Sequence, residues 1–185
     1  METPSTLLSQ RHLWRLPALI FVTVGNATQP FPRLLHAVEE LARAGCWGSE
    51  EVFIQSGNNP AFRPLYCRHR PFLNMEEFVT YINEARVVVS HGGCGTLLHA
   101  VRAKKCPVVM PRIKEYREHI NDHQLQLVRA LANERKVIPV YKPEELESAV
   151  ARANYISSGD KDRGSTLIAL VGRAVRETLE KNSAK

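Results

Sequence analysis

The segment from which the fold can be inferred reads Val87-Val88-Val89-Ser90-His91-Gly92-Gly93-Cys94-Gly95-Thr96. It begins with three apolar, β-branched valines and ends in a cluster of glycines. An uninterrupted run of valines is typical of a strand buried on both faces, as the strands of parallel sheets are. The glycines predict a tight turn, and a helix is expected from about residue 96 to 104. A buried strand that passes through a turn into a helix is the repeating unit of an α/β sheet.

The same alternation of short apolar strands and amphipathic helices continues on both sides of this segment. Strands are expected at 19–24, 52–55, 65–67, 87–89, 107–110 and 137–140. Helices are expected at 34–42, 75–82, 96–104, 120–131, from 143 onward, and at 164–181. The pattern predicts a doubly wound, mostly parallel, Rossmann-like sheet in a single domain over 18–181. An irregular leader (1–17) precedes this domain, and a short tail (182–185) follows it.

Composition excludes several classes of protein. The chain has 185 residues, of which 44% are hydrophobic and 24% charged, so it can bury a core and is not disordered. No apolar run approaches the ~20 residues of a membrane-spanning helix, and the N-terminus does not resemble a secretory signal. Four cysteines without a C-x-x-C pair indicate reduced thiols. We therefore expect a cytoplasmic protein.

The formal net charge of +6 favours anionic partners. The basic residues are scattered, however, and a solvated face is the default interpretation of the short clusters at 68–70 and 102–105. Interleaved aromatic and basic residues, which would indicate an RNA-binding platform, are absent, so no nucleic-acid partner is expected. Arg112, Lys114 and Arg117 are expected in a solvated loop outside any site, whereas Trp47, Met75 and Met110 are expected to pack.

The glycine cluster is the first candidate site, because ligands of doubly wound sheets bind at the carboxyl ends of strands. Backbone N–H groups around Gly92, Gly93 and Gly95 can approach an anion closely, and a helix N-terminus favours negative charge. Thr96 can add a hydroxyl donor or cap the helix. The alternative is a tight turn without a ligand. The dinucleotide fingerprint and the P-loop motif are both absent, which disfavours the common nucleotide folds.

Four segments, taken together and in order, resemble the C-terminal, donor-binding half of GT-B glycosyltransferases of family 28. They are Phe21-Val22-Thr23-Val24-Gly25, Phe72-Leu73-x-Met75, Val88 to Thr96, and Asn121-Asp122-His123-Gln124. The likeness spans about residues 19–150. It is greatest to stand-alone subunits: bacterial exopolysaccharide subunits of the PssE type, and the related small subunit of the GlcNAc transferase that makes dolichol-linked chitobiose.

The resemblance implies a role for each matching residue. Phe72 and Leu73 match the position that holds the uracil ring, and His91 to Thr96 match the turn that cradles the diphosphate. Gly25 and Asn26 match the point where the backbone passes close to the phosphate and sugar. Asp122, His123 and Gln124 match the segment that reads the sugar hydroxyls. His99 replaces an acidic residue that often binds the ribose hydroxyls. Of these residues, His91, Asp122 and Gln124 are the expected catalytic ones.

Each of these residues also has a simpler interpretation. Phe72 could pack in the core, Asp122 and Gln124 could cap or decorate a helix start, and His91 could bond a neighbouring carbonyl. Cys94 could have a lowered thiol pKa at a helix N-terminus, although packing is the better explanation.

Metal binding is not expected. His119 and His123 are four residues apart and would share a helix face, as zinc ligands can. No H-E-x-x-H arrangement accompanies them, however, and the resemblance implies chemistry without a metal or other cofactor, with a UDP-sugar as substrate.

The resemblance also implies a partner, because the acceptor site and the general base of two-domain relatives lie mostly in the other half. We expect the donor-binding, catalytic subunit of a two-component hexosyltransferase, inverting and metal-independent, in bacterial exopolysaccharide or glycan synthesis. A membrane-associated partner subunit would bind the lipid-linked saccharide acceptor and recruit the chain to the inner face of the membrane. A non-catalytic subunit that enhances a partner transferase is the alternative, and another nucleotide-sugar-binding enzyme, such as an epimerase or dehydrogenase, is a weaker one.

Overall fold

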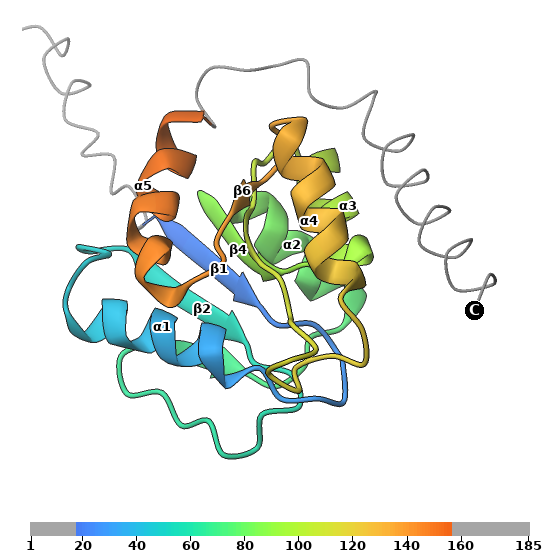
Figure 1. The fold of residues 1–185 in the computed structure, drawn as a ribbon. Helices are drawn as coiled ribbons and strands as arrows, with labels where there is room; N and C mark the ends of the chain where they lie inside the picture. The colour runs from blue at the N-terminus through green and yellow to red at the C-terminus, as the bar shows by residue number, and fades with distance from the viewer. Residues whose placement is uncertain (1–17, 157–185) are drawn as a thin grey trace, which may run out of the picture.

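The computed structural model describes residues 18–156 and has the expected doubly wound α/β architecture (Figure 1). Six parallel strands form one sheet in the order β3-β2-β1-β4-β5-β6. The strands are β1 (Leu19–Thr23), β2 (Glu51–Gln55), β3 (Arg68–Arg70), β4 (Val87–His91), β5 (Val108–Met110) and β6 (Ile138–Pro139). The helices are α1 (Pro32–Arg43), α2 (Met75–Glu84), α3 (Cys94–Arg102), α4 (His123–Asn133), the short 3-10 helix η1 (Pro143–Glu145) and α5 (Leu146–Ile156). The predicted leader, the predicted helix at 164–181 and the tail lie outside the described residues.

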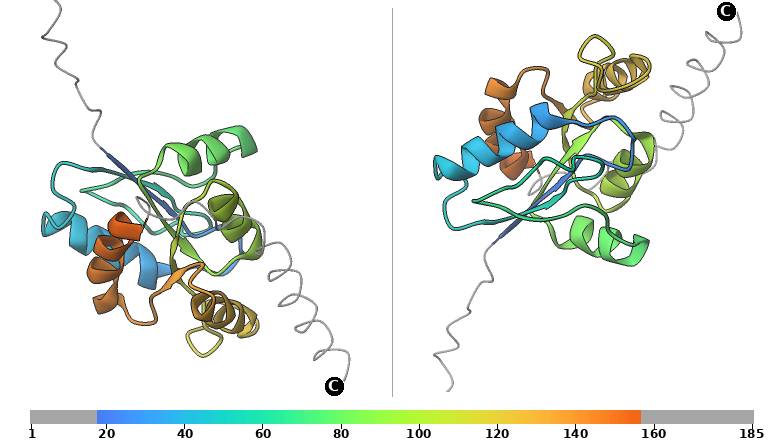
Figure 2. Two further views of the ribbon diagram at one scale, coloured as in Figure 1. Left: turned by 90° about the horizontal axis from the view of Figure 1, so that it is seen from above. Right: turned by 90° about the horizontal axis from the view of Figure 1, so that it is seen from below.

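Both faces of the sheet are covered by helices, which explains why its central strands are continuous apolar runs. Successive side chains of a strand point to opposite faces. Ile20 and Val22 of β1 pack with residues of α1 and α5, whereas Phe21 packs with residues of α2 and α3. Figure 2 shows α1 and α5 on one side of the sheet and α2 and α3 on the other. Val109 of β5 packs with α3 and α4. The helices therefore form two layers with the sheet between them.

An aromatic cluster fixes α2 over β1 and β2. The ring of Phe21 stacks on Tyr81 at a centroid distance of 5.3 Å and meets the edge of Phe78 at 5.8 Å. Phe53 of β2 stacks on Tyr81 at 4.1 Å. Such pairs add to the free energy gained by burial of the rings. The cluster thereby holds the first turn of α2 at the carboxyl edge of the sheet.

Several predicted boundaries were wrong by one to three residues. The third strand is β3 rather than 65–67, because an edge strand takes its register from backbone pairing with β2 and needs no apolar side chains. The helix expected from 96 begins at Cys94. The helix expected from 120 begins at His123, and Ile120 is 72% exposed in the preceding loop. Within residues 18–156, no helix has the length and apolar character needed to cross a bilayer.

Replacing Phe21 tests the contribution of the aromatic cluster to stability. Phe21 is fully buried, so Phe21→Ala should lower the free energy of unfolding by about 3–5 kcal/mol through lost burial and a residual cavity. Urea denaturation measures the change. Phe72→Ala is the matched control, because Phe72 is 49% exposed and its loss should cost less than about 1 kcal/mol. Equal losses in the two variants would contradict this description of the core.

Candidate functional site

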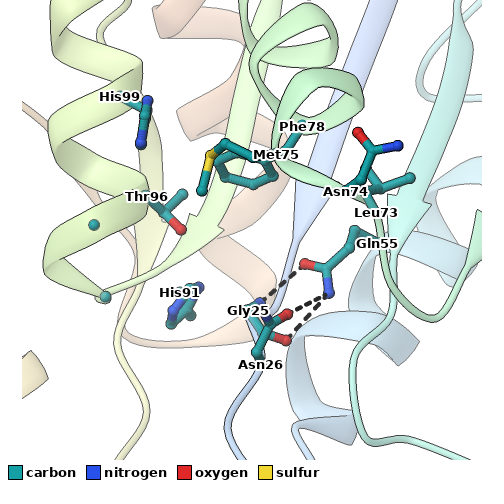
Figure 3. Close-up of a pocket in the computed structure, with 12 residues that line it drawn as sticks. Gly25, Asn26, Gln55, Leu73, Asn74, Met75, Phe78, His91, Thr96 and His99 are labelled. Atoms are coloured by element: carbon teal, nitrogen blue, oxygen red, sulfur yellow. Dashed lines mark hydrogen bonds between the residues drawn. The ribbon is translucent and has the colours of Figure 1, made fainter.

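The sheet has a topological switch point between β1 and β4. These strands are neighbours, but the chain returns to the sheet at β2 after β1 and at β5, on the opposite side, after β4. The connections therefore diverge and leave a crevice at the carboxyl ends, where doubly wound proteins bind ligands. A cavity of about 290 Å³ lies at this point (Figure 3). It is lined by Gly25, Asn26, Gln55, Leu73, Asn74, Met75, Phe78, His91, Gly93, Gly95, Thr96 and His99.

One wall of the cavity is the start of α3. Gly93 is the N-cap residue and has no side chain with which to cap the helix. The first intrahelical bond runs from the Leu97 N–H to the Gly93 carbonyl at 3.1 Å, so the amides of 94–96 have no acceptor within the helix. Gly95 is exposed, and a Cβ built on it would have no atom within 4 Å. The positive end of the helix thus opens onto space that an anionic group can fill.

His91, the last residue of β4, lies in contact with two glycines. A Cβ at Gly25 would come 2.5 Å from the imidazole Cε1, and a Cβ at Gly93 would overlap the ring still more closely. Gly25 also has a φ of +72°, a backbone conformation that residues with a side chain rarely adopt. The imidazole Nδ1 lies 3.4 Å from the Thr23 carbonyl oxygen. Because a carbonyl can only accept, a neutral ring carries its hydrogen on Nδ1, and Nε2 is left as an acceptor. The expected bond from His91 to a neighbouring carbonyl is therefore present.

The imidazole of His91 is neutral at neutral pH. Burial and the positive charge of Arg112 lower its pKa from the ordinary 6.5 to about 4, against the opposing effect of the Thr23 carbonyl. A charged ring would be unfavourable at this position because the ring is shielded from solvent and lies near the cationic Arg112.

The opposite wall of the cavity is apolar and comes from the segment that begins α2. Leu73, Met75 and Phe78 line it, and Phe78 meets the edge of the His99 ring at a centroid distance of 5.9 Å. Asn74 caps α2: its Oδ1 accepts from the Glu77 N–H, and the Glu77 side chain accepts from the Asn74 N–H. This reciprocal capping fixes the loop against the helix.

Eight of the expected site residues line the cavity: Gly25, Asn26, Leu73, His91, Gly93, Gly95, Thr96 and His99. Four further lining residues were missed: Gln55, Asn74, Met75 and Phe78. Met75 was expected to pack but is 64% exposed at the cavity wall. Gln55 had a usable signal, because it is the polar residue that ends the apolar run Val52-Phe53-Ile54 at the carboxyl edge of a strand.

Phe72, Gly92, Asp122, His123 and Gln124 do not line this cavity. Phe72 does not pack in the core either, since half of its surface is exposed. The side chain of Asp122 accepts a bond from the Lys114 N–H at 2.9 Å instead of capping α4.

Gln124 supports the glycine turn from behind. It is buried, and its Oε1 accepts from the Gly92 N–H at 3.1 Å and from the Arg112 N–H at 3.2 Å. A Cβ at Gly92 would lie 3.0 Å from both the Gln124 Cβ and a methyl group of Val128. The first glycine of the cluster therefore allows the turn to pack closely against α4.

Arg112 is buried, contrary to the expectation of a solvated loop. Its guanidinium donates to the carbonyls of Gln29 at 2.7 Å, Val24 at 2.9 Å and Glu118 at 3.0 Å. Burial lowers its pKa to about 10, so the group stays charged at neutral pH. Arg112 thereby ties the loop after β1 to the loop after β5.

Two other expectations concern histidine and cysteine. His119 lies in the loop before α4 and not on the helix with His123, so the idea of a shared face was wrong. Within residues 18–156, no three His, Cys, Asp or Glu residues are grouped so as to hold a metal. Burial raises the pKa of the Cys94 thiol, and Cys94 packs against a hydrophobic cluster, as the packing interpretation requires.

The cavity combines an uncapped helix start with an apolar wall. None of its lining residues is acidic, and the charged Arg112 lies near enough to His91 to lower its pKa. This arrangement suits a ligand with an anionic group at α3 and an apolar ring at Leu73, Met75 and Phe78.

A family model named the glycosyltransferase family 28 C-terminal domain matches residues 19–162. The chain belongs to this family. The UDP-N-acetylglucosamine transferase subunit ALG13 of Yarrowia lipolytica (strain CLIB 122 / E 150) is 26% identical over 131 residues, which are 65% of this chain and 63% of that protein. The family assignment thus agrees with the resemblance of the four segments, whereas the PssE type stays a prediction.

Solved glycosyltransferases share the fold of this family 28 domain. The glycotransferase of kitacinnamycin superposes with a TM-score of 0.57 at 16% identity, over 90% of this chain and 43% of the other. The calicheamicin glycosyltransferase CalG4 gives a TM-score of 0.52 at 17% identity, over 88% of this chain and 39% of the other. The chain thus spans less than two thirds of the curated relative and less than half of either structure.

The buried neutral His91 predicts a pH dependence of stability. Between pH 6.5 and about 4 the unfolded chain binds a proton at this residue that the folded chain does not. The contribution of His91 to stability is therefore fully present above pH 6.5 and is lost as the pH falls toward 4, with a slope of up to about 1.4 kcal/mol per pH unit.

Chemical denaturation of the wild type and of His91→Gln across this range measures the effect. The wild type should lose stability on acidification more steeply than the variant, whatever the offset between them above pH 6.5. If the free energies of unfolding of the two proteins changed with pH in parallel, His91 would not remain neutral in the folded chain.

Proposed function

We propose that this chain is the donor-binding, catalytic subunit of a two-component glycosyltransferase that moves a sugar from a UDP-sugar to a lipid-linked saccharide acceptor. The observation that carries the proposal is the cavity at the β1/β4 switch point, where the uncapped start of α3 faces an apolar wall. Membership of family 28 supports sugar transfer as the reaction.

The start of α3 would stabilise the leaving group. As the bond to the sugar breaks, negative charge grows on the departing diphosphate. Amides of 94–96 and the helix dipole are already oriented toward that charge, so little reorganisation is needed during the reaction. A diphosphate beside His91 would also favour the protonated imidazole, which could then donate from Nε2. This proposal requires no metal.

The remaining groups would recognise the rest of the donor. The wall formed by Leu73, Met75 and Phe78 would hold the uracil ring. His99 lies one helical turn beyond Thr96 and would face the ribose. From outside this cavity, Asp122, His123 and Gln124 would hydrogen-bond the hydroxyls of the donor sugar. Gln124 would also support the Gly92 turn through its Oε1.

The acceptor side would come from a partner subunit. The described residues that line the cavity include no carboxylate. His91 would face the diphosphate, so we place the general base for the acceptor hydroxyl on the partner. The similar Yarrowia lipolytica protein is itself described as a transferase subunit. We propose a membrane-associated partner that binds the lipid-linked acceptor and brings this chain to the inner face of the membrane. The acceptor hydroxyl would attack the anomeric carbon from the side opposite the departing diphosphate, which inverts the configuration of the transferred sugar. An exopolysaccharide pathway is one setting for this reaction.

Gly95→Val tests whether this chain holds the donor. The valine would extend into open space in the cavity, so the fold should be retained while the diphosphate is excluded. Affinity for UDP, measured by calorimetry, should fall about tenfold or more, which corresponds to about 1.4 kcal/mol. Sugar transfer by the complex with a co-purified partner should fall in parallel.

Ala130→Val, at an exposed position of α4, is the matched control and should leave both measurements unchanged. Loss of UDP binding with full transfer by the complex would favour the alternative, an accessory subunit that enhances a partner transferase. Unchanged UDP binding by Gly95→Val would overturn the proposed donor site.

A further inference from the structure

We infer that Gln55 is a positioning residue that holds two walls of the donor cavity at a fixed separation: the apolar wall that begins α2, and a further wall formed by the loop after β1. This inference rests on the proposed function of that cavity. Gln55 ends β2 at the carboxyl edge of the sheet and is 2% exposed. It lies between the loop after β1 and the loop after β3, and Figure 3 shows its amide directed at Gly25 and Asn26.

The oxygen of the Gln55 amide binds the end of β1. Oε1 accepts from the Gly25 N–H at 3.2 Å and from the Thr23 hydroxyl. The Gly25 N–H also approaches the Thr23 hydroxyl oxygen at 3.2 Å. These bonds fix Gly25 in the left-handed conformation that places it against His91.

The nitrogen of the same amide binds both walls. Nε2 donates to the Pro71 carbonyl at 2.9 Å and to the Gly25 carbonyl at 3.2 Å, with Asn26 Oδ1 at 3.3 Å. Carbonyl oxygens can only accept, so the nitrogen must face them, and the orientation of the amide is determined. Pro71 leads directly into Leu73 and the capped start of α2, whereas Gly25 and Asn26 belong to the other wall.

A neighbouring glycine strengthens this connection. The Gly57 N–H donates to the same Pro71 carbonyl at 2.8 Å. Gly57 has a φ of +55°, and a Cβ there would overlap the Gly25 carbonyl oxygen. The loop after β2 therefore passes close to Gly25 as well. Gln55, at the end of β2, bonds both walls through its side chain.

A substitution that removes the N–H donors of Gln55 but keeps the size of its side chain tests the positioning role. Gln55→Glu keeps the length and the acceptor oxygen, but as a carboxylate it would face the Pro71 and Gly25 carbonyls and repel them. Burial against these oxygens should raise the pKa of the introduced carboxyl. On protonation it could again donate to one carbonyl, so the connection should return at low pH. Gln55→Met removes every bond and has no proton to regain.

The titratable groups around this position are shared by all variants. His91 and His99 line the same cavity, and Arg70, which pairs with Gln55 in the sheet, bonds Glu77 through its side chain. Ratios of UDP dissociation constants, variant over wild type at each pH, therefore cancel the titration of UDP itself and of every group whose pKa the substitution leaves unchanged.

Calorimetry of UDP binding between about pH 8 and pH 5.5 tests the inference. Gln55→Glu should bind about tenfold or more weakly than the wild type at the upper pH and within about threefold at the lower pH. Gln55→Met should be weakened by a similar factor at both. Gln126→Glu, which adds the same charge at an exposed position of α4, should match the wild type throughout.

Wild-type affinity in folded Gln55→Met, or a loss in Gln55→Glu that does not recover on acidification, would overturn the positioning role while leaving the proposed function intact. Absence of UDP binding by the wild type would overturn both. If Gln55→Glu does not fold at the upper pH, Gln55→Met decides the outcome by itself.

Discussion

The close approach of β1 and β4 at their carboxyl ends depends on the space that two missing Cβ atoms leave for one imidazole ring. His91 occupies that space between Gly25 and Gly93, and a side chain at either glycine would displace it. Burial beside Arg112 favours the neutral ring and lowers its pKa. The start of α3 and the first loop of the chain are thereby brought to the same cavity.

The groups that build the site are mostly backbone atoms, held in place by buried amide and guanidinium side chains. Gln124 supports the Gly92 turn, Gln55 connects the loops after β1 and β3, and Arg112 binds the carbonyls of the loop after β1. Each of these side chains satisfies backbone groups that would otherwise be buried without partners. A site of this kind binds an anion through dipoles that are oriented before the ligand arrives.

Periodicity predicted the central strands well, because a strand covered on both faces must be apolar along its length. It failed for β3, an Arg-His-Arg edge strand that depends on pairing with β2 and carries no apolar signal. Gly93 and Gly95 of the α3 turn could be foreseen because their roles are local, whereas the role of Gly92 depends on its packing against α4. The buried position of Arg112 could not, since its acceptor at Val24 lies 88 residues away in sequence. The same holds for Met75, whose exposure at the cavity depends on how α2 is packed.

The central claim is that backbone amides at the start of α3 form an anion site. A titration of isotope-labelled protein with UDP, followed by amide NMR, tests it most directly. Saturable shifts of the amides of residues 93–96 and of Gly25, all with one dissociation constant, are expected. Saturable shifts confined to other parts of the chain, or none at millimolar UDP, would contradict it.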